Sequence, residues 1–146
     1  MTSPELVITR RFDAPRALVW QAWTNPAHAT RWGPAGFTTP ERTVPTHPGG
    51  AWHALMISPD GKPYRQHGVL LEIVPLERLV YTFIWDESPD VEMVVTVTFA
   101  DRGEQTEMVF RQTGFASVAE RDGHRGGWTE AFDALAGVVA SLRAER

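Results

Sequence analysis

The chain contains no cysteine, a single lysine (Lys62) and no long apolar run. The lack of cysteine excludes disulfides, thiolate zinc sites and cysteine nucleophiles. The net charge is −4 and no run of Lys or Arg occurs, so we expect no nucleic-acid surface and no polybasic membrane patch. No apolar stretch approaches the ~20 residues that span a bilayer, and the first residues do not form a signal peptide. We therefore expect a cytoplasmic protein that does not insert into membranes.

The motifs of metal, nucleophile and phosphate sites are also missing. None of the five histidines falls in an H-E-x-x-H motif or another close metal-ligand spacing. His53 and His67 flank Asp60-Gly61 almost symmetrically, so they face each other if their strands pair in register and lie on opposite faces after a one-residue slip. Neither a G-x-S-x-G nucleophile elbow nor a glycine-rich phosphate loop occurs. We predict no metal site, no cofactor and no assigned catalytic residue.

The composition is that of a folded domain rich in large rings. The chain has 146 residues, of which 42% are hydrophobic and 22% charged, which indicates a globular protein with a sizeable core. Residues 1–146 are therefore expected to form one domain. Six Trp and seven Phe are many for this length, and such rings either fill a core or build the walls of a ligand site.

The last thirty or so residues, 117–146, predict one long amphipathic helix. Ser117 and Glu120 have the spacing of a capping box, which marks the helix start. Apolar residues then recur at three- and four-residue steps on one face, so this face must pack against a large surface, which a curved sheet provides. Trp128 and Phe132 on that face either fill the core or line one wall of a cavity between helix and sheet.

The residues before this helix predict strands and two short helices. A strand over 6–12 is followed by a helix with Asp13 as N-cap and Pro15 in its first turn. Asn25 is expected to cap a second short helix over 28–32. The apolar period then changes to two, which predicts about six strands near 37–44, 51–58, 66–74, 79–85, 91–99 and 106–113. Short turns between them imply a strongly bent antiparallel sheet of six to seven strands in an α+β fold.

Several motifs, taken in order, resemble the bacterial branch of the family named after the activator of the heat-shock protein 90 ATPase. They are Phe12-Asp13-Ala14-Pro15, Val19-Trp20-Gln21-Ala22-Trp23-Thr24, Trp32-Gly33-Pro34, Pro48-Gly49-Gly50-Ala51-Trp52, Pro59-Asp60-Gly61, Gly68-Val69, Glu72-Ile73-Val74-Pro75 and Gly127-Trp128. The resemblance implies the helix-grip fold of the START/SRPBCC superfamily, whose members bind lipids, polyketides or other hydrophobic molecules and are in a minority enzymes. The co-chaperone role belongs to larger eukaryotic relatives with an extra N-terminal domain, and we do not transfer it.

Alternation along the strands predicts which side chains would form the walls of a cavity. Gln112 closes an otherwise apolar row, so it either emerges at the rim or offers a hydrogen bond inside the pocket, and Tyr81 brings a hydroxyl to an apolar face. A few polar groups in an apolar cleft fix a ligand's orientation. The predicted wall residues are Trp52, Met56, Tyr81, Phe83, Trp85, Met93, Phe99, Phe110, Gln112, Trp128 and Phe132.

Four further features allow more than one interpretation. Glu72 has apolar neighbours, so it is either a buried acid or base, or a solvent-facing residue on a half-exposed strand. Arg10 would pair with an acidic ligand, with Glu72 or with solvent. Gly123, Gly126 and Gly127 either kink the long helix, let it approach the sheet closely, or make its first turns mobile as a gate. Gly68 permits a bulge or a close backbone approach in a bent strand.

Three functions remain open from the sequence. The leading hypothesis is a protein that binds a small hydrophobic or amphipathic ligand, without a cofactor, as a monomer or homodimer. The alternative is an enzyme similar to polyketide cyclases or dehydratases that uses Tyr81, Glu72 or Gln112 in the same cavity. The third is a stress- or chaperone-linked interaction module with a filled core and no pocket.

Overall fold

The computed structural model describes residues 4–145, which form one antiparallel sheet of seven strands, a long C-terminal helix and two short helices. The strand order across the sheet is β1-β7-β6-β5-β4-β3-β2. This arrangement confirms the predicted α+β helix-grip fold. In chain order, the elements are β1 (Glu5–Phe12), α1 (Arg16–Thr24), α2 (Pro26–Ala29), β2 (Thr38–Arg42), β3 (Ala51–Ile57), β4 (Pro63–Val74), β5 (Arg78–Trp85), β6 (Met93–Arg102), β7 (Gln105–Thr113) and α3 (Val118–Ala144).

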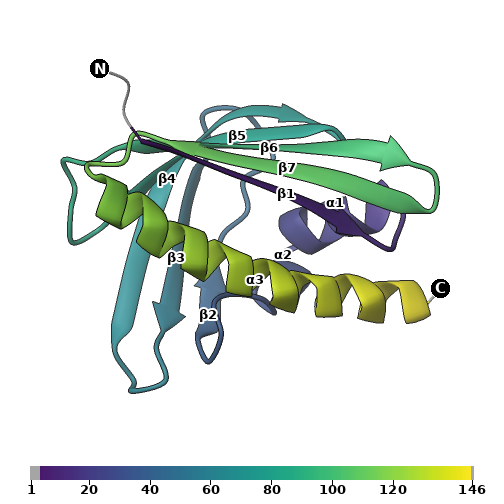
Figure 1. Ribbon diagram of the computed structural model, residues 1–146, viewed down its shortest axis with the longest axis horizontal. Coiled ribbons are helices and arrows are strands. Elements are labelled where there is room, and N and C mark those ends of the chain that lie inside the picture. The colour runs from purple at the N-terminus through teal and green to yellow at the C-terminus, as the bar shows by residue number, and fades with distance from the viewer. Residues whose placement is uncertain (1–3, 146) are drawn as a thin grey trace.

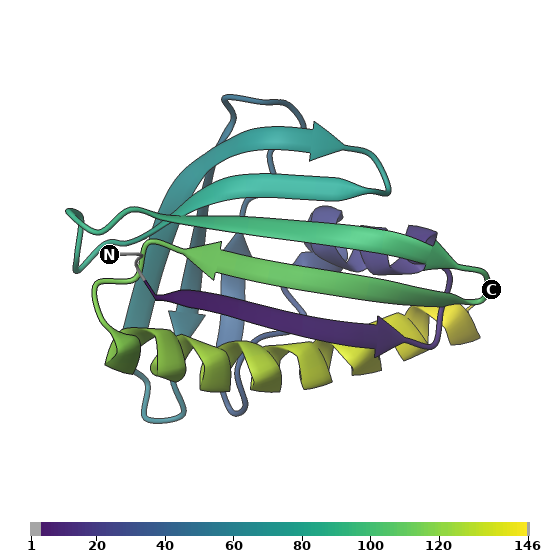
Figure 2. The same cartoon turned by 45° about the horizontal axis from the view of Figure 1, so that its top comes forward.

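The sheet curls around α3. Figures 1 and 2 show α3 running along the concave side of the sheet, with α1 and α2 beside its C-terminal half. The strands β2, β3 and β4 bend away from β1, β6 and β7 and curve toward the N-terminal half of α3. A strongly twisted open sheet curls in this way when one face is covered by a helix. Within residues 4–145, no helix combines the length and apolarity that a membrane crossing needs.

Two of the three predicted helix caps are confirmed. The Ser117 hydroxyl accepts a hydrogen bond from the Glu120 amide at 3.1 Å, and the Asn25 side chain accepts one from the Ala27 amide at 3.0 Å. The prediction of Asp13 as a cap is wrong. Pro15, in an extended conformation, occupies the N-cap of α1, and the helix begins at Arg16. Asp13 therefore lies two residues before the N-cap position. The Asp13 carboxylate instead pairs with Arg143 at 3.1 Å.

The second helix is shorter than predicted. It ends at Ala29 instead of continuing to Trp32. The chain leaves the helix so that the Trp32 ring turns into the core, where its indole N–H donates a 3.0 Å hydrogen bond to the Ala22 carbonyl. Burying the large indole ring with its N–H hydrogen-bonded stabilises the fold more than one further turn of so short a helix would.

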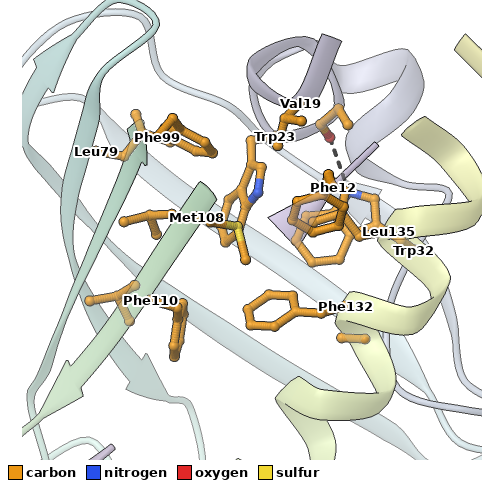
Figure 3. Close-up of a cluster of buried hydrophobic side chains, with 14 of the residues drawn as sticks. Phe12, Val19, Trp23, Trp32, Leu79, Phe99, Met108, Phe110, Phe132 and Leu135 are labelled. Carbon is orange, nitrogen blue, oxygen red and sulfur yellow. Dashed lines mark hydrogen bonds between the residues drawn. The ribbon is translucent and has the colours of Figure 1, made fainter. Parts of the chain in front are cut away.

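The core lies between the sheet and the C-terminal half of α3. The predicted alternation is confirmed in β6, where Met93, Val95, Val97 and Phe99 are all buried. Figure 3 shows rings from the sheet and from α3 meeting in this core. Phe110 and Phe132 lie edge to face with their centroids 5.3 Å apart.

Gly68 makes the close backbone approach that the sequence allowed. A Cβ built at this position would overlap the Thr82 carbonyl oxygen on the neighbouring strand. The same carbonyl accepts a 2.8 Å hydrogen bond from the Trp52 indole, and the Thr82 hydroxyl accepts one from the Val69 amide at 2.8 Å. Gly68 therefore lets β4 and β5 approach closely while the Trp52 ring crosses over β4.

Candidate functional site

Two adjoining pockets lie between the concave face of the sheet and α3. The larger has a volume of about 530 Å³ and lies against the N-terminal half of α3 and the loop before β2. The smaller has a volume of about 80 Å³ and extends toward the end of α1 and the loop after β2. The two share Trp32, Arg42, Gln66, Phe83 and Trp128 as lining residues. They are therefore adjoining compartments, one large and one small, that share part of their walls.

Six of the eleven predicted wall residues line these pockets: Trp52, Met56, Tyr81, Phe83, Trp85 and Trp128. The other five are Met93, Phe99, Phe110, Gln112 and Phe132, which are almost fully buried and line neither pocket. The position of Trp128 explains why Phe110 and Phe132 are excluded. Its ring lies 4.5 Å from that of Phe110 and 5.6 Å from that of Phe132, so it closes the space next to them and leaves only its other side open.

Gln112 holds two side chains of the pocket wall in place. Its side-chain oxygen accepts a 2.9 Å hydrogen bond from the Trp128 indole and lies 3.2 Å from Nδ1 of His124. The Trp85 indole donates to Nε2 of His124 at 3.0 Å. Because Nε2 accepts, Nδ1 must carry the proton and donate to Gln112. Gln112 is fully buried, so it does not emerge at the rim, and its oxygen is used by the protein itself.

Protonation of His124 conflicts with this network. Burial lowers the pKa of His124 from 6.5 to about 4, and a second ring proton on Nε2 would face the N–H of Trp85. The other ionisable side chains that line this pocket are Arg42, Tyr64, Glu87 and Glu130. The neutral ring is therefore the form that the folded protein selects.

We predict that the free energy of unfolding decreases as the pH falls from about 6.5 to about 4. In that window the unfolded chain binds a proton at His124 and the folded chain does not, which amounts to a loss on the order of 2 kcal/mol. His124→Asn is expected to remove this part of the pH dependence, whereas His47→Asn, in an exposed loop, is expected to leave it unchanged. Urea unfolding at a series of pH values measures the difference, and equal pH profiles for the two variants would contradict the assignment.

Arg42 and Gln66 are polar residues of the site that sequence reasoning missed. Arg42 pairs with Ala54 across β2 and β3, and Ala54 pairs with Gln66 across β3 and β4, so the three side chains form one row on the concave face. Nη1 of Arg42 donates to the Ala29 carbonyl at 2.9 Å, and the guanidinium lies over the Trp32 ring at 4.9 Å. No ion pair among the described residues involves Arg42.

Burial also affects the ionisable groups of the smaller compartment. It lowers the pKa of Arg42, against a smaller opposing effect of Tyr81, and raises the pKa of the Tyr81 phenol, an effect that the Arg42 charge partly offsets. Tyr81 therefore carries its proton, and Arg42 carries the positive charge of this compartment.

The charged residues named from the sequence lie elsewhere. Arg10 pairs with Asp133 of α3 at 2.5 Å, a partner that the sequence did not suggest. Glu72 pairs with Arg78 at 3.2 Å and its side chain is 48% exposed, so the solvent-facing interpretation is confirmed and the buried acid or base is wrong. Neither residue lines either of the two pockets described above.

The two histidines on neighbouring strands do sit opposite each other. His53 pairs with His67 in the ladder of β3 and β4; His53 is exposed and His67 is half-buried. Nδ1 of His67 lies 2.6 Å from an Asp86 carboxylate oxygen, whereas His53 contacts Thr43. Across residues 4–145, no three His, Asp or Glu side chains gather closely enough to hold a metal ion.

A protein-family model described as "Activator of Hsp90 ATPase homolog 1-like protein" matches residues 13–140. No functionally curated protein matches the chain. Among solved structures, a Chromobacterium violaceum protein is 25% identical with a TM-score of 0.84, and the match covers 92% of this chain and 96% of that one. A Nitrosomonas europaea protein is 22% identical with a TM-score of 0.84, covering 96% of both chains. A Silicibacter pomeroyi protein carrying the same family name is 21% identical with a TM-score of 0.84, covering 98% and 100%. These likenesses establish the fold.

Proposed function

The chain belongs to the family of Activator of Hsp90 ATPase homolog 1-like proteins, and from this premise we propose that it binds a small hydrophobic or amphipathic molecule between the sheet and α3. The observation that carries the proposal is the pocket of about 530 Å³. Small-molecule sites range from ~300 to ~1,000 Å³ and have mostly apolar walls with a few polar groups. Six aromatic side chains line this pocket: Trp32, Phe37, Tyr64, Phe83, Trp85 and Trp128.

Binding is favoured over catalysis by the place of the polar groups. The cyclase or dehydratase alternative needs an acid or base from Tyr81, Glu72 or Gln112. Glu72 lies outside the pockets in an ion pair, and Gln112 is occupied by Trp128 and His124. Burial raises the pKa of Tyr81, so its phenol is a poor base near neutral pH. An interaction module with a filled core does not account for an aromatic-lined pocket of this volume.

A pair of glycines in α3 tests the proposal. Gly127 lines the larger pocket and Gly126 does not, yet a Cβ at either position meets no atom within 4 Å. Gly127→Leu would displace roughly 55 Å² of apolar ligand contact, which weakens binding about tenfold at ~25 cal/mol per Å². The control is Gly126→Leu, which changes the helix propensity in the same way but places its side chain outside the pocket.

The measurement is titration with the neutral fluorescent dye Nile red. We expect wild type and Gly126→Leu to bind it with equal affinity, and Gly127→Leu to bind it about tenfold more weakly. Equal affinity for both leucine variants, or no binding by the wild type, would contradict the proposed function.

The glycines also support the gate hypothesis. The interpretation that they allow a close approach to the sheet is wrong, because a Cβ at Gly123, Gly126 or Gly127 meets nothing within 4 Å. Each nonetheless costs α3 about 1 kcal/mol of helix stability relative to alanine. We propose that this cost lets the first turns of α3, which form one wall of the larger pocket, open for ligand entry.

Alanine substitutions at two open positions of α3 test the gate. Gly126→Ala and Gly137→Ala are each expected to stabilise the helix by about 1 kcal/mol. Only Gly126→Ala should slow amide exchange over residues 120–127 and slow the dissociation of Nile red, as measured by mass spectrometry and stopped-flow fluorescence. Equal slowing by both variants, or wild-type exchange over 120–127 as slow as in the rest of α3, would exclude a gate.

A further inference from the structure

We infer that the ligand carries a carboxylate, which binds at the junction of the two pockets to Arg42 and Gln66, while its apolar body occupies the larger pocket. This inference rests on the proposed function and specifies the chemical class of its ligand. It depends on the side chains that line both compartments. It does not depend on the family to which the chain belongs.

One cross-strand row of the sheet places two long polar side chains at the site. Arg42, Ala54 and Gln66 are neighbours on β2, β3 and β4, and all three belong to the concave face. Ala54, the small residue between the two, is buried and lines neither pocket, whereas Arg42 and Gln66 each line both. The two long polar side chains of the row therefore face the place where the compartments adjoin, and a small polar group bound there would lie beside both.

The protein leaves some hydrogen-bond donors of these two side chains unused. Arg42 gives Nη1 to the Ala29 carbonyl, and within residues 4–145 its Nε and Nη2 make no hydrogen bond. These two donors form a planar edge that matches the two oxygens of a carboxylate. Gln66 is only 5% exposed, and no hydrogen bond among the described residues satisfies its amide. None of these atoms is among the unpaired polar atoms that are sealed from solvent in the described chain, so they are open to the pocket, where a ligand can supply the missing partner.

The charge of the site favours a ligand with one negative charge. Arg42 is the only cation among the residues that line the two pockets, since His124 is neutral there. The acidic wall residues, Glu87 and Glu130, lie in the larger compartment and are exposed. One guanidinium balances one negative charge, whereas a phosphate ester carries about two and draws on several donors. The smaller compartment, at about 80 Å³, has room for a small head group. A monocarboxylate matches the single positive charge of the site.

The experiment compares isosteric acids and amides. Calorimetric titrations use 2-naphthoic acid against 2-naphthamide, and decanoic acid against decanamide, at pH 7. We expect the wild type to bind each acid at least tenfold more tightly than its amide. Arg42→Met is expected to abolish this preference, Arg42→Lys to retain part of it, and Gln66→Leu to weaken acid binding severalfold. Arg10→Gln, which removes an arginine that lines neither pocket, is the control and should keep the full preference.

Nile red separates failure of this inference from failure of the proposed function. The dye carries no charge, so its binding by the wild type tests the pocket without the carboxylate site, and the circular dichroism spectrum of Arg42→Met shows whether that variant is folded. Two outcomes would overturn the carboxylate site and leave the pocket proposal standing. In the first, the wild type binds the dye but prefers the acid in neither pair. In the second, the preference for acids survives in Arg42→Met. Dye binding without binding of any acid would overturn the carboxylate site equally. Loss of dye binding by the wild type would contradict the proposed function itself.

Discussion

Gly68→Ala is expected to lower the free energy of unfolding by at least about 3 kcal/mol, a large part of the total stability of a domain of this size. The added methyl group would overlap the Thr82 carbonyl oxygen on β5 and lie 2.5 Å from Nε1 of Trp52. Neither obstacle is the free end of a flexible side chain, since Trp52 is hydrogen-bonded to that same carbonyl at 2.8 Å. The strands must therefore separate, which disrupts the bend of the sheet beside the smaller pocket.

The control for Gly68→Ala is its neighbour on the same strand. Val69 is 38% exposed on the outer face, so Val69→Ala is expected to cost no more than about 0.5 kcal/mol. Urea unfolding followed by circular dichroism measures both variants. Equal effects of the two substitutions would show that the contact between Gly68 and Thr82 is not tight, and would contradict the close approach of β4 and β5.

Leucine substitutions of two buried glutamines are expected to change the free energy of unfolding very differently, and the first of them has the second large effect. Gln112→Leu should lower the free energy of unfolding by about 2–4 kcal/mol, because it leaves the N–H groups of Trp128 and His124 without their acceptor. Gln66→Leu should be neutral or stabilising, because the amide that it removes has no hydrogen-bond partner in the described chain. Both changes replace a nearly fully buried glutamine with leucine, so side-chain burial is matched.

Thermal and urea unfolding at neutral pH distinguish the two glutamines. A loss of stability in Gln66→Leu equal to that in Gln112→Leu would mean that Gln66 is already satisfied by the protein. It would also weaken the case for a ligand group at that position.

The sequence sufficed for the fold because its signals there are local. The capping box at Ser117, the three- and four-residue steps along α3 and the alternation in β6 each depend on a few neighbouring residues. The pairing of His53 with His67 is one of the two registers that near-symmetry about the turn allowed. Each of these signals depends only on the geometry of one strand, turn or helix, so packing between distant segments leaves the predicted element unchanged.

The site was less predictable because it depends on packing between distant segments. Register shifts between Thr38 and Glu41 break the alternation in β2, so strand parity does not show that Arg42 faces inward. Trp32 reaches the pockets only because α2 ends early. Phe110 and Phe132 satisfied the same apolar pattern as the true wall residues, and only the placement of Trp128 against them removes both from the pocket. Periodicity identifies the face of an element, but it does not separate a filled core from a pocket wall.

The indole N–H signals of the six tryptophans provide the most direct measurement of the central claim, that a small apolar molecule binds between the sheet and α3. In a nitrogen–proton correlation spectrum, titration with 2-naphthoic acid should shift the indole signals of Trp85 and Trp128, which line the larger pocket. Trp20, which packs on Phe99 and lines neither pocket, should not move. No shift at Trp85 and Trp128, or an equal shift at Trp20, would contradict the account.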